Sequence, residues 1–266
     1  MRVLLTNDDG IEAAGLQRMR QELLGVSGVD LVVIAPDGNR SAVGRGITFR
    51  RPVHVVPFAF ESGPAGWSTD GTPVDCVRLA DLGLAEGPKP DLVVSGINHG
   101  ANLGDDIAYS GTVAAALEGV VLGIPAIAVS QDWMRERAPQ DADDPFGQAA
   151  RFVARLVGQL ESVPLDPGTM LNVNVPTIPA TAVDVCSIGR RVYYDTLQPD
   201  GEIGPDGAGR YVLYNAEPGF HEAEGTDVSA VAAGKISITP LHLDLTHHDA
   251  VGPLTEAALG RLLDTA

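Results

Sequence analysis

The chain has 266 residues, of which 44% are hydrophobic and 20% are charged, as in a globular protein with a sizeable core. This composition excludes an intrinsically disordered chain, which buries too little apolar surface to fold. The formal net charge of −17 and a pI of about 4.5 describe a surface that repels nucleic-acid polymers and anionic membranes. We therefore expect no nucleic-acid polymer and no membrane among the partners, and a small anionic substrate would need a metal ion or a few arginines to receive it.

Cysteine usage and hydrophobic patterning indicate the cellular setting. The two cysteines, Cys76 and Cys186, have neither CxxC nor zinc-site spacing and lie in apolar contexts typical of buried free thiols. Few cysteines and the lack of a recognisable signal peptide predict a cytoplasmic protein. The longest apolar tract, residues 113–129, is interrupted by Glu118 and Pro125, so it is not expected to span a membrane.

The amino-terminal segment predicts a strand, a helix and a second strand. A run of strand-forming residues, 3–5, ends in a polar turn that contains Asp8 and Asp9. A helix is expected over residues 13–24, where apolar side chains recur on one face, and a strand over residues 30–35. A β–α–β unit of this length implies a right-handed crossover and parallel pairing, which places the polar loop after the second strand beside the acidic pair.

The acidic pair is the first candidate site. In an open parallel α/β sheet, chemistry takes place outside the carboxyl ends of the strands. Adjacent carboxylates such as Asp8 and Asp9 are costly when they are buried without a partner, which favours a hard divalent metal with oxygen ligands. The alternative is a helix N-cap followed by acidic first-turn residues, which would stabilise the next helix through its dipole.

The loop over residues 35–46 supplies glycines, the hydroxyl of Ser41 and two arginines, Arg40 and Arg45. Glycine-rich backbone next to arginine suits an oxyanion. The alternative is a flexible surface loop in which Ser41 bonds only its own backbone and Arg45 is an ordinary surface residue.

The next part of the chain leads to a second polar segment. A strand is expected over residues 51–59, and a helix begins at Thr72 with Pro73 in its first position and ends near residue 83. A buried strand then follows residue 91 and ends at Asn98, and a further helix covers residues 113–122. The amino terminus of that helix carries Ser110, Gly111 and Thr112, whose free N–H groups and hydroxyls form a ready anion site.

The remaining elements complete an α/β core and add an extension. They are a strand over residues 126–130, an amphipathic helix over 146–160, strands over 170–175 and 183–188, a short helix over 226–234, a strand over 236–241 and a closing helix over 254–263. Tyrosine- and valine-rich strands over 190–197 and 210–216 flank a turn-rich loop and predict a long hairpin. Since a two-stranded hairpin is marginal alone, we expect it to pack against another subunit.

Oxygen-bearing side chains follow three separate strands, at Asp8 and Asp9, Ser41, and Asn98. No Cys or His is needed in this set, which favours Mg²⁺, Mn²⁺ or Ca²⁺ over zinc. Together with the anion site it predicts a phosphate-handling metal centre. Two alternatives stay open, because Asn98 is also suited to a left-handed turn and His99 is either a general acid or a structural residue. Residues 105–106, both Asp, are expected to be solvated loop charges or caps.

Ordered motifs along nearly the whole chain carry a family likeness. They are Leu4-Leu5-Thr6-Asn7-Asp8-Asp9-Gly10, Ala35-Pro36-Asp37 with Arg40-Ser41-Ala42, Gly71-Thr72-Pro73, Ser95-Gly96-Ile97-Asn98, Tyr109-Ser110-Gly111-Thr112-Val113, Glu118-Gly119, Thr226-Asp227 and Ile236-Ser237-Ile238-Thr239-Pro240-Leu241. With these motifs the sequence resembles the survival protein E (SurE) family of metal-dependent nucleotidases.

The resemblance implies a phosphomonoesterase that acts on nucleoside 5′- and 3′-monophosphates and extends to short polyphosphate. It implies one divalent cation, Mg²⁺ or Mn²⁺ with Ca²⁺ as a possible occupant, and a homodimer or homotetramer. The implied metal ligands are Asp8, Asp9, Ser41 and Asn98. The implied phosphate contacts are Asn98, Ser110, Gly111 and Thr112, and the implied catalytic residues are Asp8, Asp9 and Asn98. Whether water or an aspartate attacks phosphorus stays open.

We therefore expect an α/β fold with a Rossmann-like, open, mostly parallel sheet and helices on both faces. Residues 1–189 are expected to form the catalytic core, 190–225 a protruding hairpin, and 226–266 a segment that returns to the core or to a partner subunit. Two rivals remain. A haloacid-dehalogenase-like phosphatase would need Asp-x-Asp after its first strand, and a receiver-like Mg²⁺-binding signalling module without hydrolytic activity would be near half this length. A dinucleotide-binding dehydrogenase is disfavoured because the first turn lacks GxGxxG.

Overall fold

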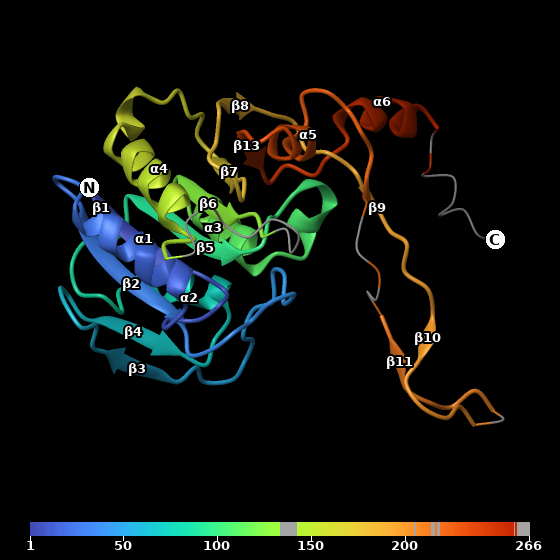
Figure 1. Ribbon diagram of the computed structural model, residues 1–266, viewed down its shortest axis with the longest axis horizontal. Coiled ribbons are helices and arrows are strands. Elements are labelled where there is room, and N and C mark those ends of the chain that lie inside the picture. Colours follow the sequence, from blue (N-terminus) through green and yellow to red (C-terminus); the bar gives the residue numbers. More distant parts are fainter. Residues whose placement is uncertain (134–142, 205, 214–215, 217–218, 258, 260–266) are drawn as a thin grey trace.

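The computed structural model describes residues 1–133, 143–204, 206–213, 216, 219–257 and 259, and its centre is a nine-stranded sheet (Figure 1). The spatial order is β3-β4-β2-β1-β5-β6-β7-β13-β8. The strands are β1 (Arg2–Thr6), β2 (Asp30–Pro36), β3 (Val55–Phe58), β4 (Gly66–Thr69), β5 (Leu92–His99), β6 (Ala126–Gln131), β7 (Thr169–Val175), β8 (Val183–Val185) and β13 (Ile236–His242). The neighbouring strands β4, β2, β1, β5, β6 and β7 run parallel to one another. At the two sides of this set, β3 pairs antiparallel with β4, and β13 pairs antiparallel with β7. The predicted open, mostly parallel sheet is confirmed.

Helices cover both faces of the sheet, as predicted (Figure 1). On one face α1 (Ala14–Leu24) and α4 (Gly147–Gly158) bury a cluster that includes Leu5. On the other face α2 (Pro73–Asp81) and α3 (Gly111–Val121) bury a cluster that includes Leu4. Because successive side chains of a strand point to opposite faces, the apolar run of β1 serves both clusters at once.

Local sequence explains where the two helices nearest the carboxyl edge begin. Thr72 and Asp75 form a reciprocal capping box at α2, with Asp75 N donating to Thr72 Oγ1 at 3.2 Å and Thr72 N donating to Asp75 Oδ2 at 2.9 Å. Ser110 caps α3, because its Oγ accepts from Val113 N at 3.1 Å. The cap places the start of α3 at Gly111, two residues before the start that the sequence predicted.

Three other predicted elements also differ in extent. The strand expected over residues 51–59 is confined to β3, the four residues that pair with β4. The strand expected over 183–188 ends at Val185, because the chain then leaves β13 and Ser187 N donates to Gly225 O. The closing helix, expected over 254–263, is α6 (His248–Glu256), with Pro253 inside it; residues 258 and 260–263 lie outside the described part.

The predicted hairpin extends away from the sheet as an arm (Figure 1). Near its root β9 (Arg191–Val192) pairs antiparallel with β12 (Gly219–Phe220), and farther out β10 (Gln198–Pro199) pairs with β11 (Tyr211–Val212). The paired segments are only two residues long each, shorter than predicted, because a two-stranded ribbon has no sheet face to pack on. The arm is followed by α5 (Asp227–Ala232), capped by Thr226, which matches the predicted short helix.

Two short 3₁₀ helices, η1 (Gly104–Ala108) and η2 (Leu160–Ser162), complete the fold. Among the described residues, no helix combines the length and apolarity needed to cross a bilayer. The cytoplasmic setting stays a prediction from the sequence.

Candidate metal and phosphate site

The turn after β1 is built by Asn7, whose side chain is fully buried. Its Nδ2 donates to Gly10 O at 2.9 Å, and its Oδ1 accepts from Gly10 N at 3.2 Å. Gly10 has a φ of 109°, and a Cβ there would lie 3.0 Å from Gly38 Cα, so only glycine suits this close approach of two loops. The turn therefore holds the two following acidic residues at the carboxyl edge of the sheet.

Asp8 lies directly against the amino terminus of α3. It is 3% exposed, and its Oδ1 accepts a short hydrogen bond from Thr112 Oγ1. A Cβ on Gly111 would lie 2.7 Å from Asp8 Cβ and 2.8 Å from Asp8 Oδ2. The backbone N of Arg40 also donates to Asp8 O at 2.6 Å. Residues that follow β1, β2 and η1 therefore meet at Asp8.

Asp9 connects the turn after β1 to the loop after β2 and to the end of β5. Its Oδ1 accepts from Asn39 Nδ2 at 3.2 Å, and its Oδ2 accepts from the backbone N of His99 at 3.1 Å. Asn39 Oδ1 in turn accepts from Ser41 N at 2.8 Å. The three strand ends that carry Asp9, Ser41 and Asn98 are thus joined by hydrogen bonds. Their roles as ligands stay a prediction.

Ser41 and Asn98 keep oxygen atoms free for a cation. In the described part of the chain Ser41 is bonded through its backbone N, and no hydrogen bond reaches its hydroxyl. Asn98 uses Nδ2 to donate to Gly100 O at 2.7 Å, which leaves Oδ1 unused in that bond. Since Gly100 has a φ of 115°, Asn98 also supports the turn that the sequence suggested as its alternative role.

The electrostatics of the acidic pair fit a cation. Burial raises the pKa of Asp8, the hydrogen bond from Thr112 lowers it, and the adjacent charge of Asp9 raises it. Burial also raises the pKa of Asp9, against the lowering effects of the bond from His99 N and of the nearby His99 imidazole. No Lys, Arg or His of the described residues forms an ion pair with either carboxylate, whereas the buried Glu118 pairs with Arg45 and Arg78. A divalent ion would supply the missing positive charge.

The donor set also fits the type of metal expected. Among the described residues no group of three or more His, Cys, Asp or Glu side chains could hold a metal. A metal centre at this edge would have two carboxylates together with hydroxyl and amide oxygens, the ligands typical of Mg²⁺, Mn²⁺ or Ca²⁺.

The anion site predicted at the start of α3 stays a prediction, and its two hydroxyls have different partners. The hydroxyl of Thr112 donates to Asp8, so it is not available as a donor to an anion while that bond is made. The hydroxyl of Ser110 accepts from Val113 N and keeps its own proton for donation. The positive end of the helix dipole remains aimed at the acidic pair, which places an anion-binding group beside a cation-binding one.

Comparison with known proteins identifies the family. The family described as "Survival protein SurE" matches residues 3–195. The chain belongs to the SurE family. A protein of Rubrobacter xylanophilus named 5′-nucleotidase SurE is 47% identical over 272 residues, with 99% of each chain covered. A protein of the same name from Symbiobacterium thermophilum is 45% identical over 258 residues and covers 96% of this chain and 97% of its own length.

The SurE fold is also matched in a solved structure. The crystal structure of the SurE protein from Aquifex aeolicus has a TM-score of 0.79 and 38% sequence identity, and it covers 97% of this chain and 99% of that chain. The likeness therefore includes nearly the whole α/β core together with its extension. The predicted family and fold class are confirmed.

Sequence reasoning missed several contacts in this SurE site. Asn39 was not singled out, although it joins Asp9 to the loop of Ser41. The expectation of a solvated charge holds for Asp105, which is exposed in the first turn of η1 and accepts from Arg191 N at 2.9 Å. It was wrong for Asp106, which forms an ion pair with the Arg191 guanidinium. These two carboxylates attach the arm to η1, just before the start of α3.

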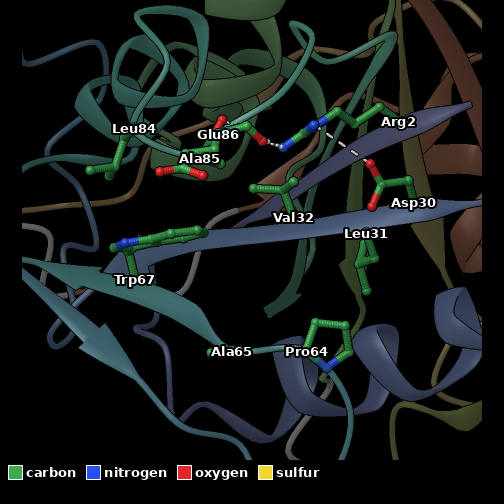
Figure 2. Close-up of a pocket in the computed structure, with 10 residues that line it drawn as sticks. All are labelled: Arg2, Asp30, Leu31, Val32, Pro64, Ala65, Trp67, Leu84, Ala85 and Glu86. Carbon is green, nitrogen blue, oxygen red and sulfur yellow. Dashed lines mark hydrogen bonds and ion pairs between the residues drawn. The ribbon is translucent and has the colours of Figure 1, made fainter.

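A separate hollow in the described part of the chain is not this site. A pocket of about 470 Å³ lies at the opposite edge of the sheet, where β1 and β2 begin (Figure 2). Arg2 forms the polar wall of this pocket, and Trp67 forms the far wall. The Nη2 of Arg2 donates to Glu86 O at 2.7 Å, and its Nη1 lies 3.6 Å from Asp30 Oδ2. Since the guanidinium is already partnered, we assign the chemistry to the acidic pair and not to this pocket.

Proposed function

We propose that this SurE-family chain is a 5′-nucleotidase, a divalent-metal-dependent phosphomonoesterase that releases phosphate from nucleoside 5′-monophosphates. One observation carries the proposal: of two adjacent carboxylates without an ion-pair partner in the described chain, Asp8 lies against the amino terminus of α3 and Asp9 is held by the loops after β2 and β5. The 5′-nucleotidase names of relatives at 47% and 45% identity support it.

In this proposal Asp8, Asp9, Ser41 and Asn98 hold one divalent cation, Mg²⁺ or Mn²⁺, and Ca²⁺ is able to occupy the same oxygen ligands. When bound, such an ion polarises a phosphoryl oxygen and offsets the charge that develops there. Hydrogen bonds from Asn39 and from the backbone of His99 hold both oxygens of Asp9 in place. This restraint reduces the reorganisation needed when substrate arrives.

The phosphate is proposed to bind at Asn98, Ser110, Gly111 and Thr112. Backbone N–H groups at a helix start and the unused proton of the Ser110 hydroxyl are suited to anionic oxygens. Asp8 and Asp9 ligate the metal, one of them orients or activates the attacking group, and together with Asn98 they are the proposed catalytic residues. The proposal extends to 3′-monophosphates and short polyphosphate, on the strength of the SurE likeness.

Phosphate release from a panel of 5′- and 3′-mononucleotides and a short polyphosphate tests this function. The protein is stripped with EDTA and assayed alone and after addition of Mg²⁺, Mn²⁺ or Ca²⁺. We expect release that EDTA abolishes and Mg²⁺ or Mn²⁺ restores. Metal binding without turnover of any substrate would overturn the proposal in favour of a receiver-like binding module. A trapped phospho-aspartate would instead favour the haloacid-dehalogenase type of chemistry.

We also propose a homodimer or homotetramer, with residues 1–189 as catalytic core, 190–225 as oligomerisation arm and 226–266 as the segment that returns to the core or to a partner. Side chains of the arm support this division, since Tyr194, Leu197 and Leu213 are 61%, 70% and 65% exposed. Exposed apolar surface of this kind marks a protein–protein contact. Light scattering coupled to gel filtration measures the assembly.

A further inference from the structure

Asp227, at the start of α5, is a fully buried carboxylate that lies outside the candidate site. Among the described residues its hydrogen-bond donors are backbone N–H groups. Its Oδ2 accepts from Gly104 N at 2.9 Å, and its Oδ1 accepts from Gly189 N and Val228 N, each at 2.8 Å. A buried carboxylate is costly unless such bonds satisfy it, so the charge itself requires these three N–H groups to stay in place.

The three donors belong to different parts of the fold. Gly104 begins η1, Gly189 is the last residue before the arm, and Val228 lies in α5. A Cβ on Gly104, whose φ is 55°, would lie 3.0 Å from Gly189 O. A Cβ on Gly189 would lie 2.7 Å from Val228 Cγ2. The segments therefore meet without room for a further side chain, and Asp227 is the group that all three share.

The chain just before η1 is held from the opposite side by buried polar side chains of the sheet. Asn102 N donates to Asn174 Oδ1 at 2.8 Å, and Asn102 Nδ2 donates to Ser130 Oγ at 2.8 Å. Asn172 Nδ2 donates to Asn102 O at 2.9 Å. Since Ser130 is in β6 and both partner asparagines are in β7, residues 102–104 are fixed between the ends of two core strands and the carboxylate of Asp227.

η1 leads directly to the proposed phosphate contacts. Only Tyr109 separates the end of η1 from Ser110, which caps α3. A Cβ on Gly44, in the loop after β2, would lie 3.4 Å from Ala108 O, so that loop packs against the end of η1. A shift of η1 would therefore displace the start of α3, which lies against Asp8.

We propose that Asp227 is a positioning residue for the phosphate site, which fixes η1 and through it the start of α3. The inference rests on the proposed 5′-nucleotidase function and adds to it a residue 123 positions away from Gly104 in the sequence. Asp227 acts through the backbone of Gly104 and not by contact with the substrate. The role matters because catalysis of phosphoryl transfer depends on the placement of groups around the phosphate.

The test compares Asp227→Asn with Thr226→Ala. Asparagine keeps the size of the side chain, but its Nδ2 would face the N–H of Gly104 or Gly189, donor against donor. We expect kcat/KM for adenosine 5′-monophosphate to fall about tenfold and the Kd of inorganic phosphate, measured by calorimetry with Mg²⁺ present, to rise about tenfold. The Kd of Mn²⁺, measured by electron paramagnetic resonance, should change less than about twofold, because the proposed ligands follow β1, β2 and β5.

Thr226→Ala is the matched control for a general loosening of α5. It removes the cap that accepts from Ser229 N, one residue away, but leaves the bonds to Asp227. We expect this variant to lose stability and to keep the wild-type phosphate Kd. If Asp227→Asn does not fold, Gly104→Ala is measured in its place, because its Cβ strains the same junction from the other side.

The outcomes separate the positioning role from the function on which it rests. A wild-type phosphate Kd in the folded junction variant, or an equal rise in Thr226→Ala, overturns the positioning role, and continued nucleotide hydrolysis would then still support the nucleotidase. Weaker phosphate binding in the junction variant alone, in a protein whose wild type hydrolyses no nucleotide, supports the positioning role and overturns the nucleotidase. A wild-type protein that neither binds phosphate nor hydrolyses nucleotides overturns both.

Discussion

The carboxyl edge of β1 and the arm use apolar side chains in opposite ways. Leu4 and Leu5 are fully buried between helices on the two faces of the sheet. In the arm, by contrast, Leu197 and Leu213 are 70% and 65% exposed, although they belong to a segment of equally strand-like composition. The difference teaches that polar groups are held in fixed positions where the strand beneath them is buried by its own chain, whereas the described residues leave the apolar side chains of the arm uncovered.

At the carboxyl edge of β1, we expect the largest loss of activity from Asp8→Asn. Asparagine keeps the shape and can still accept from Thr112, but it removes the negative charge that the proposed metal needs. We expect the metal-dependent kcat to fall about a hundred- to a thousandfold while thermal unfolding shows a folded protein. Asp30→Asn, an exposed carboxylate at the opposite edge, is the control and should leave kcat unaltered. Wild-type turnover in folded Asp8→Asn would contradict the assignment.

The packing of α3 against Asp8 is tested by Gly111→Ala. The added Cβ would come within 2.7 Å of Asp8 Cβ, so either α3 or the acidic turn must move. We expect kcat/KM to fall about ten- to a hundredfold and the free energy of unfolding to fall by about 1–3 kcal/mol.

Gly252→Ala in α6 provides the matched control for that change. A Cβ there meets nothing within 4 Å, and alanine in a helix is favoured over glycine by up to about 1 kcal/mol. We therefore expect unaltered activity and equal or greater stability. If the two alanine variants behave alike, close packing of α3 on Asp8 does not matter for catalysis.

The pH dependence of stability tests the hydrogen bonds that Asp75, at the start of α2, accepts from Thr48 and Thr72. Burial alone would raise the pKa of Asp75, but hydrogen bonds from Thr48 and Thr72 lower it below its ordinary value. A depressed carboxyl pKa adds stability that is fully present above the unfolded-state pKa, near 4, and is lost as pH falls through the folded-state value. Asp75→Asn should therefore cost about 1–2 kcal/mol at neutral pH.

Urea unfolding of the wild-type protein and Asp75→Asn at pH 7, 5 and 3.5 measures this effect. The difference between the two proteins should be constant from pH 7 to 5 and shrink below about pH 4. A difference that does not depend on pH would mean that the hydrogen bonds of Thr48 and Thr72 do not require the ionised carboxylate.

The sheet and its functional edge could be predicted because buried parallel strands have an unmistakable pattern. Continuous apolar runs that end abruptly in polar residues, as β1 does at Asp8, report both the strand and the edge at which chemistry occurs. The same pattern predicted that Ser41 and Asn98 would lie near the acidic pair, and hydrogen bonds through their neighbours Asn39 and His99 connect those loops to Asp9.

Contacts between distant residues could not be predicted in the same way. Thr112 and Asp8 are 104 positions apart, and a hydroxyl at a helix start looks the same whether it receives phosphate or holds a carboxylate. Asp106 looked like a solvated charge because its partner, Arg191, lies in the arm. The hydrophobic periodicity of the sequence does not predict where the arm runs relative to η1. Where pairing depends on few residues, as in β10 and β11, composition predicts a hairpin but not its paired length.

The arm is the region where single substitutions should affect stability least and assembly most. Leu197→Asp or Leu213→Asp places a charge on a side chain that is already exposed, so the free energy of unfolding of the subunit should change by no more than about 0.5 kcal/mol. If these leucines are covered by another copy, the same charge becomes buried at the contact, and the oligomer should dissociate at micromolar concentrations. Leu82→Asp is the matched control, because Leu82 is 81% exposed on the core at the end of α2. Light scattering on the three variants decides: dissociation confined to the arm variants identifies the arm as the contact, and a wild-type mass in all three means that the arm does not hold the assembly together.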